Sequence, residues 1–185
     1  MGAAELHKKV VGKLEVGDVL LLCERGIIHS LHRLIQRTKK WHHVLLYVGN
    51  GKTLEVTPRK GGHISKLNLT PKRCRKFAVL RSKKLTQSQK KELVQKAIRM
   101  FNGKKFFQLQ PLKMLLFRDL FPKIRANPCL LTTGYACRSP VTTCSTAVSI
   151  IYYAYGQLVS AVYKPEYIMP SDYASPQDFY AIMEI

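Results

Sequence analysis

Two strand-length segments joined by an Asn-Gly pair constrain the fold of this chain more than any other feature. The first segment, residues 42–48, reads HHVLLYV, and the second, residues 52–57, reads KTLEVT, with Asn-Gly at positions 50–51 between them. Asparagine and glycine tolerate the positive φ angles of a tight turn, so the two segments are predicted to form an antiparallel β-hairpin. His43 then lies at the start of one strand and Glu55 on its partner.

Three further segments are expected to add strands to this hairpin. The pair Gly17-Asp18 is a turn signal, and the apolar run VLLLC that follows it at 19–23 is typical of a buried strand. Two more short strands are expected near 63–67 and 77–80. These segments together predict a small, mostly antiparallel sheet or half-barrel.

Helices are expected in three places. The first covers about 27–37, where apolar residues recur at helical spacing. The second has Thr86 and Gln89 at the spacing of a capping box, one apolar face, and an end at the Asn-Gly pair at 102–103. The third begins near Cys144 and continues through the apolar run STAVSIIYYAY. We therefore expect an α+β protein in which the sheet packs against helices.

The length and the apolar content indicate one domain. A chain of 185 residues with 46% hydrophobic residues can bury one core and is too short for two full domains. Residues 1–185 are therefore expected to form a single domain. Residues 108–140 are basic and apolar and are expected to be an insertion, either a cover over the core or an element that contacts a membrane surface or a partner. The tail beyond Gly156 is rich in Tyr and Pro and is expected to be loop-like.

The positive charge is concentrated in one region. Residues 39–125 hold 23 of the 31 Lys and Arg residues and three of the 11 Asp and Glu residues, so this region carries the whole net charge of +20. Such a surface attracts acidic partners, for example nucleic acid or anionic lipid headgroups, and salt weakens the attraction. A solvated basic face without a dedicated partner is the alternative.

The cellular compartment is inferred from signals that the sequence lacks. No run approaches the roughly 18 consecutive apolar residues of a membrane-spanning helix. The N-terminal MGAAELHKKV carries neither an export signal nor a myristoylation signal. The five cysteines, at positions 23, 74, 129, 137 and 144, are scattered and lack the close pairs of a zinc site. We expect a reducing, cytoplasmic compartment, and association with a membrane surface is left open.

Cys144 has the predicted surroundings of a reactive thiol. It is expected in the first turn of a helix, where backbone N–H groups and the helix dipole favour the thiolate. His43 could act as the base that removes and returns the proton, and Glu55 could orient the imidazole through its second nitrogen. Each residue also has an ordinary explanation, because cysteines on helices and histidines on strands usually serve packing alone.

Two separated segments resemble the YiiX-like branch of the permuted NlpC-type papain-like hydrolases, a family that includes poxvirus relatives. In the segment 17–67, the resemblance rests on Gly17-Asp18, Leu34-Ile35-Gln36, His43-Val44, Asn50-Gly51, Glu55, Pro58 and Gly61-Gly62. In the segment 141–156, Cys144-Ser145 opens an apolar helix, as in that family. The order of histidine, acid and cysteine is the reverse of that in ordinary papain-like enzymes, as the permuted group requires.

The resemblance implies a permuted papain-like fold and a thiol-dependent activity. In such an enzyme, Cys144 attacks an amide, ester or thioester carbonyl and forms an acyl-enzyme, and an oxyanion hole includes the Cys144 backbone N–H. The chemistry needs no metal and no organic cofactor. Members of the family and their acyltransferase cousins act on peptides or on lipid acyl groups, so the resemblance implies a hydrolase or acyltransferase and does not settle its substrate.

Two assignments within this site have rivals. His42 directly precedes His43, and His43 is preferred as the base because it immediately precedes the Val-Leu-Leu strand. His63 is the rival of Glu55, since the segment GGHISKL places it on a following strand. Glu55 is preferred as the group that orients the base, from the register of the family motif.

A different class of function is the alternative to catalysis. The chain could be a binding module that uses its basic surface to hold nucleic acid or an anionic membrane, with Cys144 serving only to pack the core. Selective labelling of Cys144 by a thiol electrophile separates the two functions, because an activated thiol reacts near neutral pH and a packing thiol does not.

Overall fold

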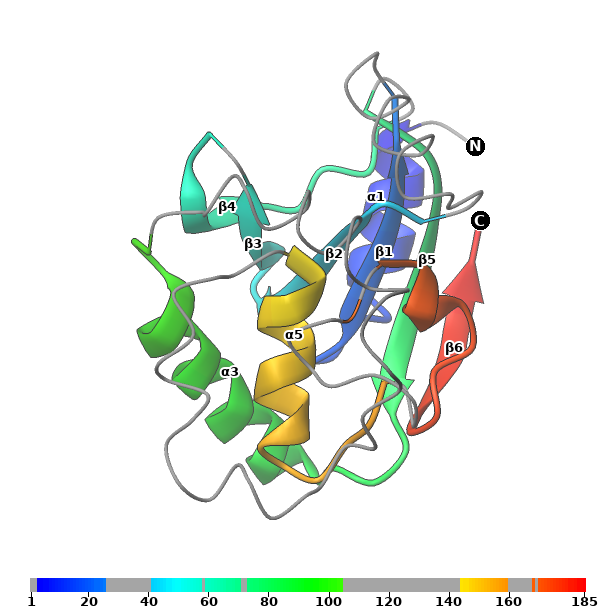
Figure 1. The fold of residues 1–185 in the computed structure, drawn as a ribbon. Helices are drawn as coiled ribbons and strands as arrows, with labels where there is room; N and C mark the ends of the chain where they lie inside the picture. Colours follow the sequence, from blue (N-terminus) through cyan, green and yellow to red (C-terminus); the bar gives the residue numbers. More distant parts are fainter. Residues whose placement is uncertain are drawn as a thin grey trace, which may run out of the picture.

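The computed structural model contains every predicted strand and two of the three predicted helices (Figure 1). The residues it describes are 3–25, 41–57, 59–70, 73–104, 144–159, 168 and 170–185. The helix predicted over 27–37 and the insertion predicted at 108–140 lie outside the described residues.

The described strands form one open, antiparallel sheet of six strands in the order β4-β3-β2-β1-β5-β6. The strands are β1 Val19–Glu24, β2 His43–Gly49, β3 Lys52–Thr57, β4 Gly61–Lys66, β5 Cys74–Ser82 and β6 Phe179–Glu184. The expected α+β class and the expected small antiparallel sheet are therefore confirmed, and the sheet is open.

The β2–β3 hairpin forms at the predicted place. Asn50 and Gly51 have φ angles of 51° and 65°, in the left-handed region that a tight hairpin turn uses. Leu46 of β2 pairs with Leu54 of β3. Because the turn sets this register, it determines which residues of β2 and β3 lie opposite each other.

The C-terminal tail contains more regular structure than we expected. The tail beyond Gly156 was predicted to be loop-like, but Pro170–Ala174 form a 3₁₀ helix, η4, and the last residues form β6 at the sheet edge. Phe179 is buried, and its ring packs edge-on against Tyr152 with the centroids 4.8 Å apart. The prediction was wrong because pairing with β5 and burial of Phe179 are tertiary contacts, which local composition does not reveal.

Helices cover both faces of the sheet (Figure 1). The helices α3 Gln87–Phe101 and α5 Cys144–Tyr153 pack on one face, where they share a core with alternate residues of β1, β2, β3 and β5. The helix α1 Ala3–Val11, which was not predicted, packs on the other face through Val10. No described helix is long and apolar enough to cross a membrane.

The start of α3 has the predicted capping box. The Thr86 hydroxyl accepts a hydrogen bond from the Gln89 backbone N–H at 3.3 Å, and the Gln89 side chain accepts one from the Thr86 N–H at 2.9 Å. These two bonds satisfy N–H groups that would otherwise lack partners at the helix start. The helix ends at Phe101, next to the predicted Asn-Gly pair.

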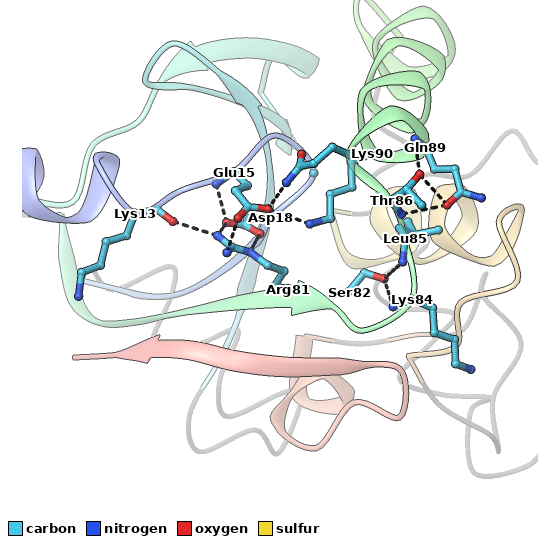
Figure 2. A network of polar contacts seen from close by, with 12 residues as sticks. Lys13, Glu15, Asp18, Arg81, Ser82, Lys84, Leu85, Thr86, Gln89 and Lys90 are labelled. Atoms are coloured by element: carbon cyan, nitrogen blue, oxygen red, sulfur yellow. Dashed lines mark hydrogen bonds and ion pairs between the residues drawn. The ribbon is translucent and has the colours of Figure 1, made fainter.

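A buried ion-pair network fixes the turn before β1 relative to β5 and α3 (Figure 2). Asp18 is fully buried, and both of its carboxylate oxygens accept hydrogen bonds from the Arg81 guanidinium at 2.8 Å. Glu15 accepts hydrogen bonds from Arg81 at 2.6 Å and from Lys90 of α3 at 2.9 Å. Tyr152 of α5 donates to the carbonyl of the residue before Asp18. The same turn therefore positions α3 and α5 on the sheet.

Gly62 is the point where the end of α3 meets β4. A Cβ atom added there would lie 1.9 Å from the carbonyl oxygen of Phe101. The Gly62 N–H and C=O groups also form 2.8 Å hydrogen bonds with Lys104 and Gly103. Only a glycine leaves room for this backbone-to-backbone contact.

We expect Gly62→Ala to lower the free energy of unfolding by about 1 to 3 kcal/mol, the usual cost of overpacking, as measured by urea denaturation. Gly12→Ala is the matched control, because the atom nearest to its added methyl group is the Lys8 carbonyl oxygen at 3.4 Å. Equal changes in the two variants would contradict the close-contact explanation.

Candidate active site

The structure brings the three predicted site residues together. His43 is the first residue of β2, Glu55 lies in β3, and Cys144 is the first residue of α5. The His43 Nε2 atom lies 3.2 Å from Oε2 of Glu55. The Cys144 thiol is close enough to His43 to raise the pKa of the imidazole through its charge and a hydrogen bond. Residues far apart in the sequence thus share one site because α5 packs on β2 and β3.

The Glu55 carboxylate is buried and contacts four side chains. Its Oε2 atom faces His43 at 3.2 Å and accepts a hydrogen bond from Nη2 of Arg73 at 3.1 Å. Its Oε1 atom accepts a hydrogen bond from the Ser65 hydroxyl and lies 3.7 Å from Nε2 of His63. The rival histidine therefore contacts the same carboxylate, on the oxygen that does not face His43.

These contacts shift the pKa values of the pair in opposite directions. Burial, the largest contribution, lowers the pKa of His43, but the Cys144 charge and hydrogen bond, the Glu55 hydrogen bond and the Glu24 charge together raise it to about 10. Burial raises the pKa of Glu55, but hydrogen bonds from His43 and Ser65 and the positive charges of His43 and Arg73 lower it to about 2. An ionised Glu55 beside a protonated His43 is therefore the favoured state at neutral pH.

The two adjacent histidines have different partners. Nε2 of His42 accepts a hydrogen bond from the backbone N–H of Glu24 at 2.8 Å, which joins His42 to β1. His43 instead contacts Glu55 and lies beside Cys144. The geometry of a base between an acid and a thiol is thus found at His43.

The first turn of α5 is held by the C-terminal segment. The Ser145 hydroxyl donates a hydrogen bond to the Ile168 carbonyl at 2.7 Å, and the Tyr173 hydroxyl donates one to the Ser145 carbonyl at 3.1 Å. Ser145 and Tyr173 are both buried. Because Cys144 belongs to the same turn, these bonds restrain the position of its thiol.

An apolar pocket lies beside the Cys144 side chain, between the sheet and the two helices α3 and α5. Its other lining residues are all apolar: Val44, Leu46, Leu54, Val56, Ala97, Phe101, Ala147 and Val148. The surroundings of the sulfur on this side are therefore apolar.

Sequence reasoning missed Arg73 and Glu24 as parts of this site. Arg73 counted only toward the positive charge of the region 39–125, yet its Nε atom donates a 2.6 Å hydrogen bond to Oε1 of Glu24 and its Nη2 atom binds Glu55. One signal was available: Glu24 ends the apolar strand VLLLC, and a carboxylate next to a buried strand needs a cation or hydrogen-bond donors.

The remaining described histidines and cysteines show no metal centre. Among the residues that the structure describes, no group of three or more His, Cys, Asp and Glu side chains is arranged to hold a metal ion. Cys23 and Cys74 are buried free thiols, and burial raises the pKa of Cys74 to about 11. A thiol of that pKa stays protonated at neutral pH and is a poor nucleophile.

The chain was compared with known proteins. No protein-family model matches the sequence, and no curated protein sequence matches it.

Proposed function

We propose that the chain is a thiol-dependent hydrolase or acyltransferase that acts on an amide, ester or thioester through an acyl-enzyme on Cys144. The observation that carries the proposal is the position of His43, whose imidazole contacts the Glu55 carboxylate and lies beside the Cys144 thiol. An acid, an imidazole and a nucleophile in that order are the arrangement that activates a thiol.

Each group has a defined part in the proposed reaction. Because Nε2 of His43 is bound to Glu55, Nδ1 is the nitrogen left to exchange a proton with the Cys144 sulfur. The raised pKa of His43 favours the imidazolium, and a neighbouring imidazolium stabilises the negative charge that the sulfur carries when it attacks. Glu55 keeps the imidazole in the required orientation and stabilises its positive charge.

Acyl transfer then takes place in two steps. The sulfur electron pair forms a bond to the carbonyl carbon, and the C=O π electrons move to oxygen, which we propose is stabilised by the backbone N–H of Cys144 at the first position of α5. The leaving group departs with the proton from His43 and leaves a thioester. Water, or another acceptor, gives a proton to His43 and attacks the thioester carbonyl, and the released sulfur recovers its original state.

The finer fold assignment is part of the same proposal. We propose that the open antiparallel sheet with α5 on β2 and β3 is a permuted papain-like fold of the NlpC type. The motifs at 17–67 and 141–156 support it, as does the order His43, Glu55, Cys144 along the chain.

One observation favours the second candidate function, a binding module for anionic surfaces. Exposed Lys52 of β3 and exposed Lys66 of β4 lie directly opposite each other. Like charges in this position repel, and a bound anion would relieve the repulsion. Nucleic acid and an anionic membrane both supply such anions.

The first prediction concerns Cys144 reactivity. We expect iodoacetamide at neutral pH to alkylate Cys144 before Cys23 and Cys74, because its thiolate is stabilised by an imidazolium while theirs are buried. Peptide mass spectrometry identifies the labelled residue. We expect His43→Ala to slow the labelling of Cys144 at neutral pH by at least about tenfold, and His42→Ala is the matched control.

Acyl transfer is tested with a p-nitrophenyl ester. We expect a burst of nitrophenolate and a matching acyl mass on Cys144, and both should be lost in Cys144→Ser. If Cys144 is alkylated at the rate of an ordinary thiol and no nitrophenolate burst is seen, the proposed function is contradicted.

The pH dependence of stability tests the Glu55 contacts. The pKa of Glu55 is about 2 in the fold, below the ordinary value of about 4.3, so the fold favours the ionised form. Its contribution to stability is complete above the ordinary value and is lost as pH falls through about 2. We expect the free energy of unfolding of the wild type to fall more steeply over this range than that of Glu55→Gln, as measured by urea denaturation.

Glu5→Gln is the control for this experiment, because Glu5 is exposed on α1. It should retain the wild-type dependence on pH. Parallel curves for the wild type and Glu55→Gln would contradict the proposed contacts of the carboxylate.

The basic surface is tested separately from the thiol. We expect vesicles that contain phosphatidylserine to bind the wild type and Cys144→Ala equally, and we expect binding to weaken between about 50 and 200 mM salt, as measured by co-sedimentation. Neutral phosphatidylcholine vesicles are the control. If the protein binds nucleic acid but not vesicles, nucleic acid is the anion that it recognises. If it binds neither, the binding-module function is contradicted.

A further inference from the structure

We propose that Arg73 is a positioning residue of the Cys144 site. Its guanidinium holds the Glu55 carboxylate against His43 and separates this carboxylate from that of Glu24. This inference rests on the proposed function. It assigns a role to a residue that does not contact the thiol and that the sequence motifs do not include.

Arg73 joins two buried carboxylates with one guanidinium. Its Nε atom donates to Oε1 of Glu24 at 2.6 Å, and its Nη2 atom donates to Oε2 of Glu55 at 3.1 Å. The two glutamate side chains are 7% and 4% exposed, and the arginine side chain is 28% exposed. A planar fork with donors in two directions suits this geometry, whereas a lysine ammonium is a single flexible point charge.

The backbone of Arg73 is also fixed. Its carbonyl accepts a hydrogen bond from the Arg25 N–H at 2.8 Å, and its own N–H donates to the Thr70 carbonyl at 3.0 Å. Arg73 is the residue before β5, and Glu24 is the last residue of β1, opposite Cys74 in the sheet register. The pairing of β1 with β5 therefore determines where the guanidinium lies.

The cation is needed because two like charges are buried near each other. Without a cation between them, burial and mutual repulsion would favour the protonated form of one carboxyl group. A protonated Glu55 would neither stabilise the His43 imidazolium nor keep its orientation. Arg73 binds the same oxygen of Glu55 that faces His43, so the guanidinium also determines the direction of that oxygen.

Arg73 also changes the electrostatic field at the thiol. The charged groups around His43 are Glu55 from β3, Glu24 from β1 and Cys144 from α5. His63 from β4 contacts Glu55 from the other side. After removal of the guanidinium, the two carboxyl groups either stay ionised, and their negative field opposes a negative charge on the sulfur, or Glu55 becomes protonated and no longer stabilises the His43 imidazolium. In both cases the reaction of Cys144 with an electrophile should require a higher pH.

The test measures the rate of Cys144 alkylation by iodoacetamide as a function of pH, which requires no substrate. We expect Arg73→Met to move the inflection of the profile upward by at least about one pH unit. Arg73→Lys should give a smaller upward shift, because it keeps the charge but loses the fork. Glu24→Gln should move the inflection downward, because it removes a negative charge.

Lys84→Met is the control for removing a cation from a carboxylate elsewhere in the fold. Lys84 is exposed and binds the Asp178 carboxylate at 2.7 Å. Neither residue is among the charged groups that act on His43. We expect Lys84→Met to keep the wild-type alkylation profile. If Arg73→Met does not fold, Arg73→Lys and Glu24→Gln carry the same test.

The outcomes separate this inference from the proposed function. Upward shifts in the Arg73 variants and a downward shift in Glu24→Gln support the positioning role. If the wild-type Cys144 is activated and the variants of Arg73 and Glu24 all have the wild-type alkylation profile, the positioning role is overturned and the proposed function stands. A wild-type Cys144 that reacts as an ordinary thiol at every pH would overturn both.

Discussion

The packing of the first turn of α5 against β2 and β3 is the contact on which the proposed chemistry depends. It brings Cys144 to the imidazole at the start of β2, although the two residues belong to opposite halves of the chain. This contact is supported from both ends of the helix. Tyr173 holds the first turn at Ser145, and Tyr152 in the last turn binds the Gly17 carbonyl. A shift of α5 along the sheet would break these bonds and separate the thiol from its base.

Two buried carboxylates with arginine partners serve different purposes in this fold. Asp18 accepts hydrogen bonds from Nε and Nη2 of Arg81 and joins the turn before β1 to β5, so its role is architectural. Glu55 is also buried, but it shares its arginine with Glu24 and directs an oxygen toward His43. The cost of burying these ions is offset only where hydrogen bonds satisfy them. The first network determines where the helices lie on the sheet, and the second determines the protonation state of the site.

The sequence could predict the features that depend on local signals. The Asn-Gly pair predicted the hairpin and with it the positions of His43 and Glu55. The apolar run after Cys144 predicted the helix that begins there. The family resemblance, rather than spacing, selected these residues as a group. Arg73 could not be predicted, because its contact with Glu55 depends on the pairing of β1 with β5 and on the direction of a side chain between two strands. β6 was missed for a similar reason, since its pairing depends on tertiary contacts.

The charges of the site itself bear on the choice between an enzyme and a binding module. The chain carries a net charge of +20, yet two buried glutamates act on His43 and one arginine joins them. A module that holds anions on its surface needs exposed cations, and buried carboxylates beside a cysteine would only reduce its attraction for them. An imidazolium paired with a thiolate, in contrast, is oriented by a polar group at its second nitrogen, and a carboxylate there also stabilises its positive charge. Replacing Glu24 and Glu55 with hydrophobic residues of similar volume would often be neutral or stabilising for a fold alone. The presence of these ions therefore supports catalysis as the role of the interior, and any anion binding belongs to the surface.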